Sequence, residues 1–89
     1  MHEFHLIHDL MKKISGIARD HGVSRISGVR IRLGALSHIS ASHFREHFEE
    51  AAKGTPAEGS RLEINVATDE NDPHAQEILL TSVDVVDNP

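Results

Sequence analysis

The 89-residue sequence predicts a small α/β domain of the α+β type. The expected fold is a three-stranded mixed sheet with two helices on one face, in the order helix, strand, helix, strand, strand. Two segments repeat apolar residues at helical spacing, and three shorter segments alternate apolar and polar residues as half-buried strands do. The central strand, helix and strand are compatible with a right-handed parallel crossover. Two amphipathic helices on one sheet face would bury every apolar stripe.

The first predicted helix runs from Phe4 to Ala18. Gly22 is expected to end the helix. Gly16 falls on the polar side of the helix, where it costs about 1 kcal/mol relative to alanine. The apolar stripe of this helix comprises Phe4, Ile7, Leu10, Met11, Ile14, Ile17 and Ala18.

The second segment, residues 24–34, changes to the period of a strand. Val29, Ile31 and Leu33 alternate with arginines, which predicts one buried face. Ile26 is out of phase with this set. A bulge or a twisted strand start is therefore expected near Ser27.

The second predicted helix begins after Ser40, a residue type that caps helices well, and runs to about Lys53. Gly54 stands where a left-handed cap residue is expected, and Pro56 follows it. The apolar stripe of this helix comprises Ala41, Phe44, Phe48 and Ala51.

Two more strands are predicted in the last third of the chain. Residues 61–67 alternate cleanly, and residues 68–76 form a polar, acidic loop. Residues 77–86 favour a strand whose two halves are out of phase, so a bulge is expected near Thr81-Ser82. The last two strands are expected to pair antiparallel across the loop.

Composition narrows the class of protein. A chain of this length forms one domain, residues 1–89, that buries about 60–65% of the unfolded chain's surface. It contains no apolar run long enough to span a membrane and no signal-peptide pattern, so the cytoplasm is expected. The absence of cysteine excludes disulfides and thiolate metal sites. A net charge of −5 argues against nucleic acid as a partner.

The N-terminal residues Met1, His2 and Glu3 have the chemistry of a metal site. The α-amine, the amide nitrogen of residue 2 and the His2 imidazole can close adjacent chelate rings on one ion. Such nitrogen-rich, square-planar coordination suits Ni(II) or Cu(II). The alternative is a solvated terminal histidine with no role.

Other histidines are weaker metal candidates among the eight in the chain. His5 and His8 lie three residues apart on the wet face of the first helix, where neighbours can meet but need not. His38 lies in the loop before the second helix and could reach a nearby site. His43 and His47 have the spacing for a shared ion, but a structural or interface role is favoured for them.

Several segments, in order, resemble the HypA/HybF family of nickel-insertion proteins. The resemblance covers residues 1 to about 67, and residues 78–85 are similar to the family's last strand. The matching segments are Met1-His2-Glu3 with Leu6, Arg19-Asp20-His21-Gly22, Arg30 to Ser37, Phe44-Arg45-x-x-Phe48-Glu49, and Gly54-Thr55-x-Ala57-Glu58-Gly59-x-x-Leu62-Glu63-Ile64.

The resemblance implies a nickel metallochaperone rather than an enzyme. Such a protein accepts Ni(II) and delivers it during hydrogenase maturation, in some cases to urease. The implied partners are a nickel-handling GTPase and the hydrogenase large subunit. The implied ligands are the Met1 amine, the His2 imidazole and the backbone amides of His2 and Glu3, with Glu3 also able to orient the site.

One departure from the family pattern is large. The family inserts a zinc domain, built on two Cys-x-x-Cys pairs, between its second and last strands. Here only the loop 68–76 stands in that place, so no structural zinc is expected.

An alternative function is a metal-independent protein–protein interaction module with the same fold. A hydrolase is disfavoured because no nucleophile–base pair is evident. Exposed edge strands would favour a homodimer.

Overall fold

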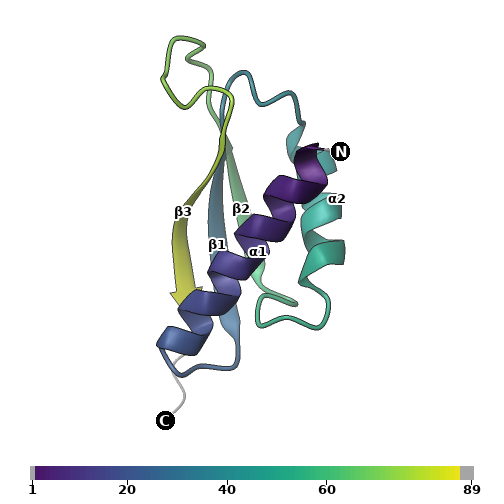
Figure 1. Cartoon of the computed structure of the whole chain (residues 1–89), viewed down its shortest axis with the longest axis vertical. Coiled ribbons are helices and arrows are strands. Elements are labelled where there is room, and N and C mark those ends of the chain that lie inside the picture. The colour runs from purple at the N-terminus through teal and green to yellow at the C-terminus, as the bar shows by residue number, and fades with distance from the viewer. Residues whose placement is uncertain (1, 87–89) are drawn as a thin grey trace.

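In the computed structural model, the backbone of residues 2–86 and the side chains of residues 6–86 are described. The elements are α1 (His2–Asp20), β1 (Ile26–Leu33), α2 (Ala41–Ala52), β2 (Arg61–Val66) and β3 (Ile78–Val85), in the predicted order. The molecule is elongated, with extents of 44 × 22 × 18 Å. Figure 1 shows both helices beside the sheet, with α1 crossing in front of the strands.

The sheet has the strand order β2-β1-β3, with β1 in the centre. Strand β1 pairs parallel with β2, as the crossover predicted. It pairs antiparallel with β3, so the expected pairing of the last two strands is wrong. The physical reason lies in burial: β1 carries four buried apolar side chains, whereas β2 buries only Leu62. The most buried strand takes the centre and contacts both neighbours.

Both predicted bulges are present in the antiparallel pair. The register moves from Ile26–Val85 to Gly28–Asp84, which leaves Ser27 as the extra residue on β1. It shifts again between Arg30–Ser82 and Ile31–Leu80, which leaves Thr81 as the extra residue on β3. Each bulge restores the alternation of buried and exposed side chains after a change of phase.

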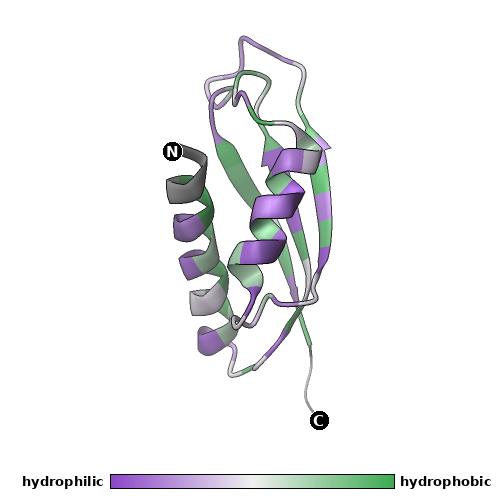
Figure 2. Ribbon diagram, turned by 90° about the vertical axis from the view of Figure 1, so that its right-hand side faces the viewer, coloured by the Kyte–Doolittle hydropathy of each residue, from purple (hydrophilic) through white to green (hydrophobic). Residues whose placement is uncertain are grey.

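Both helices cover the same face of the sheet. Val29, Ile31 and Leu33 are buried beneath them, whereas Arg30 and Arg32 on the other face are exposed. In Figure 2 the apolar side of α1 faces the rest of the fold and its polar side faces outward. No helix within residues 2–86 is long and apolar enough to cross a membrane.

The second helix is held at both ends and on one side. The Ser40 hydroxyl accepts the His43 N–H at 3.1 Å and caps the first turn. Gly54 follows the helix with φ +77°, the left-handed conformation predicted from the sequence. Phe44 and Phe48 are 0% and 2% exposed, with ring centroids 6.0 Å apart. These two side chains fix the helix against the core.

Candidate metal centre

The predicted N-terminal ligands belong to the beginning of α1. This helix starts at His2, so the amide groups of His2 and Glu3 lie in its first turn. The first N–H groups of an α-helix have no acceptor within the helix. Met1 lies outside the described residues, as do the side chains of His2, Glu3 and His5. The backbone amides predicted as ligands therefore lie in the first turn of α1.

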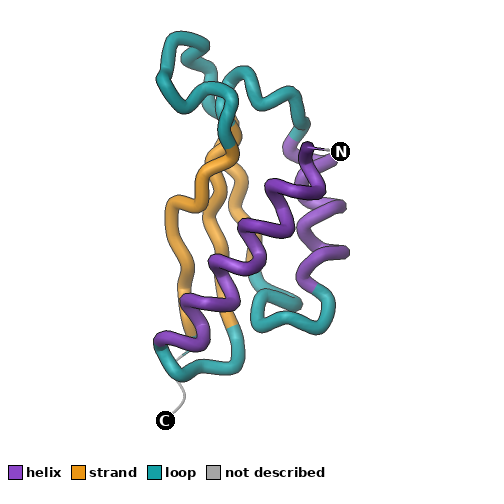
Figure 3. The backbone as a smooth tube through the Cα atoms, viewed as in Figure 1, coloured by secondary structure: helices purple, strands orange, loops and turns teal. Residues whose placement is uncertain are grey.

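The start of α1 lies at the same end of the molecule as several other candidate segments. The start of α2, the loop that contains His38, and the long loop 67–77 all lie toward this end (Figures 1 and 3). His21 and Gly22 lie at the opposite end, where α1 finishes. The loops that follow β1 and β2 therefore lie at the same end of the molecule as the start of α1.

His8 and His38 are both exposed, and no metal-binding cluster formed within residues 6–86 includes either of them. His8 lies on α1, and His38 adopts φ +61°, an uncommon conformation for a residue other than glycine. Among the side chains of residues 6–86, no three histidine, aspartate or glutamate groups converge as a metal-binding cluster. The role predicted for these two histidines stays a prediction.

A groove of about 1010 Å³ separates the outer parts of α1 and α2. Sequence reasoning missed it because its width depends on how the two helices pack. One signal was available: Gly16 has no side chain to fill the space, and a β-carbon there would meet only the Arg19 guanidinium, at 3.8 Å. The lining residues include Ile7, His8, Met11, Lys12, Ser15, Gly16, Arg19, His47, Glu50, Ala51 and Thr55.

His43 and His47 contact each other on the surface of α2. Their Nε2 atoms are 2.8 Å apart, within hydrogen-bond distance, and their ring centroids are 4.5 Å apart. His43 is exposed and His47 is half-buried at the groove. From the sequence a structural or interface role is favoured for these two residues, and the spacing alone does not decide whether the rings meet, because this depends on their rotamers.

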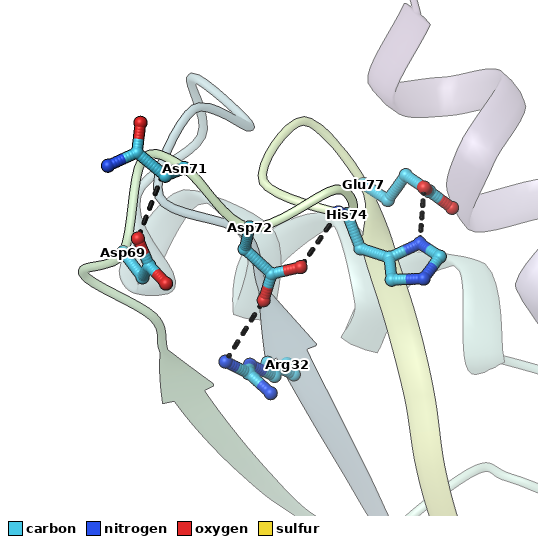
Figure 4. A network of polar contacts seen from close by, with 6 residues as sticks. All are labelled: Arg32, Asp69, Asn71, Asp72, His74 and Glu77. Atoms are coloured by element: carbon cyan, nitrogen blue, oxygen red, sulfur yellow. Dashed lines mark hydrogen bonds and ion pairs between the residues drawn. The ribbon is translucent and has the colours of Figure 1, made fainter.

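The loop 67–77 is ordered by its own side chains (Figure 4). The Asp72 carboxylate accepts the His74 N–H at 2.8 Å and lies 3.5 Å from the Arg32 guanidinium. The His74 ring contacts the Glu77 carboxylate at 2.7 Å. This hydrogen bond and the negative charge of Glu77 raise the pKa of His74. The acidic loop is largely exposed, and the contact between Asp72 and Arg32 ties it to β1.

The order of elements and the first residues of α1 agree with a family of nickel-incorporation proteins. A family model described as "Hydrogenase/urease nickel incorporation, metallochaperone, hypA" matches residues 1–71. The chain therefore belongs to the HypA family. The match includes Met1-His2-Glu3 and ends within the loop before β3.

Curated relatives support the assignment. The hydrogenase maturation factor HypA of Chloroflexus aurantiacus is 42% identical over 64 residues, which is 72% of this chain and 56% of the relative. The hydrogenase maturation factor HybF of Salmonella typhimurium is 38% identical over 65 residues, or 73% of this chain and 58% of the relative. The chain thus spans a little over half the length of these relatives.

A solved structure shares the fold. The solution structure of the Ni metallochaperone HypA from Helicobacter pylori aligns with a TM-score of 0.79 and 15% identity. The alignment covers 97% of this chain and 98% of that chain. At this identity the likeness concerns the fold alone, and it includes β3, which lies beyond the family match.

Proposed function

We propose that this chain is a nickel-binding accessory protein, without an enzymatic activity of its own, that carries Ni(II) as cargo for the maturation of a nickel enzyme. The observation that carries this proposal is the family match over residues 1–71, which includes Met1-His2-Glu3. The cytoplasm is the proposed site of action. The proposed recipient is the large subunit of a hydrogenase, with urease as a second recipient and a nickel-handling GTPase as the partner.

The proposed ligands of the ion are the Met1 amine, the His2 imidazole and the backbone amides of His2 and Glu3. The start of α1 at His2 supports the amide ligands, since first-turn amides have no intrahelical acceptor to give up. Four nitrogen donors in one plane suit Ni(II). The carboxylate of Glu3 is proposed to orient the site by hydrogen bonding.

The charge of the ion also fits this ligand set. The N-terminus of a helix carries a partial positive charge, which alone would repel a cation. Two deprotonated amide nitrogens cancel the two positive charges of Ni(II). The resulting chelate is neutral and does not oppose the helix dipole. Since its ligands must lose protons to bind, the ion should be released as pH falls.

The test is a Ni(II) titration of protein whose first residue is Met1, followed by calorimetry and by the visible absorption of square-planar Ni(II). We expect one square-planar site that disappears in His2→Ala. A matched variant with three glycines added before Met1 moves the amine out of reach of the His2 imidazole and should lose the same absorption. If the absorption persists in both variants, the N-terminal site is wrong.

A structural zinc ion is not part of the proposal. The sequence has no cysteine, and the loop 67–77 is held by carboxylate, imidazole and guanidinium contacts instead. We propose that residues 1–89 act as one nickel-binding domain. Purified protein should therefore keep its thermal stability when a zinc chelator is added.

The groove between α1 and α2 favours a second candidate function, a protein–protein interaction module that needs no metal. Ile7, Met11 and Ala51 supply apolar surface, and Lys12 and Glu50 supply charge beside it. Equal binding of the GTPase partner with and without nickel, in wild type and in His2→Ala, would favour this function. The exposed edge strands β2 and β3 could also pair with a second copy, which light scattering would detect.

A further inference from the structure

The histidine pair on α2 is the best-formed group of metal-ligating side chains among residues 6–86. His43 and His47 stand one helical turn apart, and their Nε2 atoms are 2.8 Å apart. The two nitrogens face each other across this hydrogen bond, and a small rotation of the rings brings both within reach of one ion. The pair belongs to a different helix from the proposed N-terminal site.

The helix that carries the pair is held rigidly. Phe44 and Phe48 alternate with the two histidines along α2 and are buried in the core. Ser40 caps the helix, and the Arg45 guanidinium donates a hydrogen bond to the Leu62 carbonyl of β2 at 3.0 Å. A ligand pair on a fixed helix needs little reorganisation to bind an ion, and preorganisation of this kind raises affinity.

The separation of the two nitrogens is closer to what one coordination geometry requires than to another. Imidazole nitrogens lie about 2.0–2.1 Å from a bound divalent ion, so two of them at a right angle are about 2.8–3.0 Å apart. At a tetrahedral angle they would be about 3.3–3.4 Å apart. The observed 2.8 Å matches the right angle of square-planar and octahedral ions. Such geometries are typical of Ni(II) and Cu(II).

We propose that His43 and His47 form a second metal site, which binds one Ni(II) or Cu(II) ion through both Nε2 atoms. In the metal-free protein the two nitrogens share a hydrogen bond, and the ion takes the place of the shared proton. No third histidine, aspartate or glutamate side chain among residues 6–86 joins them in a metal-binding group.

The overall charge of the chain favours a cation, while the groove that His47 lines holds Lys12 and Arg19 as well as Glu50. The chain carries a net charge of −5, and Glu46 lies between the two histidines in the sequence. The spacing His-x-x-Glu-His also occurs on the metal-binding helix of one class of zinc peptidases. Catalysis in that class needs a further protein ligand. Among residues 6–86 no such ligand joins the pair, so we expect metal binding and no peptide hydrolysis by the zinc-loaded protein.

The experiment uses the His2→Ala protein, in which the proposed N-terminal site is removed. Calorimetric titration with Ni(II) alone, and separately with Cu(II) alone, should show one remaining site. Adding H43A or H47A should weaken this binding at least ten-fold. Circular dichroism of each variant checks the fold, since both side chains lie at the surface of α2.

Two matched controls distinguish binding by this specific pair from nonspecific binding by surface histidines. His21→Ala, at the far end of α1, should leave the remaining binding unchanged. Adding S42H to the H43A protein restores the number of histidines on α2 but places them five residues apart on different faces. This variant should bind as weakly as H43A alone. Restored binding would show that spacing does not matter and would overturn the proposal.

A magnetic resonance experiment locates the ion directly. In the His2→Ala protein, substoichiometric Cu(II) should broaden the ring signals of His43 and His47 before those of His21 and His38. Broadening that spares the pair would overturn the proposal. The proposed N-terminal site fails separately: in that case His2→Ala leaves the wild-type isotherm unchanged, while H47A removes the binding.

Discussion

Gly34 and Ala75 are in backbone contact at the end of β1. A β-carbon placed on Gly34 would lie 2.1 Å from the carbonyl oxygen of Ala75 and 2.7 Å from that of His74. Ala75 belongs to the loop 67–77. Two backbone hydrogen bonds hold this loop against the end of β1: the Gly34 N–H donates to the Glu77 carbonyl at 2.9 Å, and the Leu36 N–H donates to the Ala75 carbonyl at 2.7 Å. The long loop thus lies directly on a residue that must be glycine.

Gly34→Ala should therefore lower the free energy of unfolding by about 2–3 kcal/mol, because backbone must move to admit the methyl group. Urea unfolding measures the change. Hydrogen exchange of the Leu36 amide should also accelerate, since its acceptor shifts with the loop. Unchanged stability together with unchanged exchange would contradict this contact.

Gly16→Ala is the opposite case. A β-carbon at position 16 meets nothing closer than 3.8 Å, so the variant should raise the free energy of unfolding by about 0.5–1 kcal/mol. The gain comes from a lower entropy of the unfolded chain. Urea unfolding beside Gly34→Ala gives the comparison. A loss of stability would mean that the groove between the helices needs the glycine.

Ser40→Ala should cost about 1 kcal/mol of stability, since the His43 N–H loses its acceptor. Ser40→Asp keeps an acceptor and should restore most of the loss. Thermal unfolding of both variants tests the cap. Ser24→Ala, an exposed serine outside α2, is the matched control, and an equal loss there would argue against a specific cap at Ser40.

Glu77→Gln should lower the pKa of His74. In the wild-type protein Glu77 raises this pKa above its ordinary value of 6.5 by a hydrogen bond and by its charge. Histidine ring signals followed through a pH titration measure the midpoint in each protein. Glu70→Gln, in the same loop, serves as the control. Equal His74 midpoints in wild type and Glu77→Gln would refute the contact.

The sign of the linked stability change follows from the raised pKa. The pair stabilises the fold fully below the unfolded pKa of histidine, and the contribution disappears as pH rises through the higher folded pKa. The difference in unfolding free energy between wild type and Glu77→Gln should therefore be larger at about pH 5.5 than at about pH 8.5.

Most of the fold could be predicted from the sequence because each element carries its own local signal. The phase change after Ile26 and the one between Leu80 and Val83 correctly predicted both bulges. Strand order could not be read in this way, since alternation reports which face is buried and not which strand lies alongside. The central position of β1 follows from the summed burial of the whole sheet.

For the candidate metal sites too, the sequence indicates the types of ligand but not which side chains meet. The ligand types of Met1, His2 and Glu3 are visible in the sequence and stay a prediction, because Met1 and the other two side chains lie outside the described residues. The contact between His43 and His47 could be found only in the three-dimensional structure. Four-residue spacing permits such a contact, but only the rotamers bring two nitrogens to 2.8 Å.

The strand order has a mechanical consequence for the loop 67–77. Strands β2 and β3 flank β1, so the two ends of the loop leave the sheet from opposite sides of a central strand. Neighbouring strands are about 4.8 Å apart, so these ends are anchored about 10 Å apart. A longer segment at this position would stand on two stems instead of one hinge. The sheet would then restrict the orientation of this segment, and a force that acts on the segment would be transmitted to both β2 and β3.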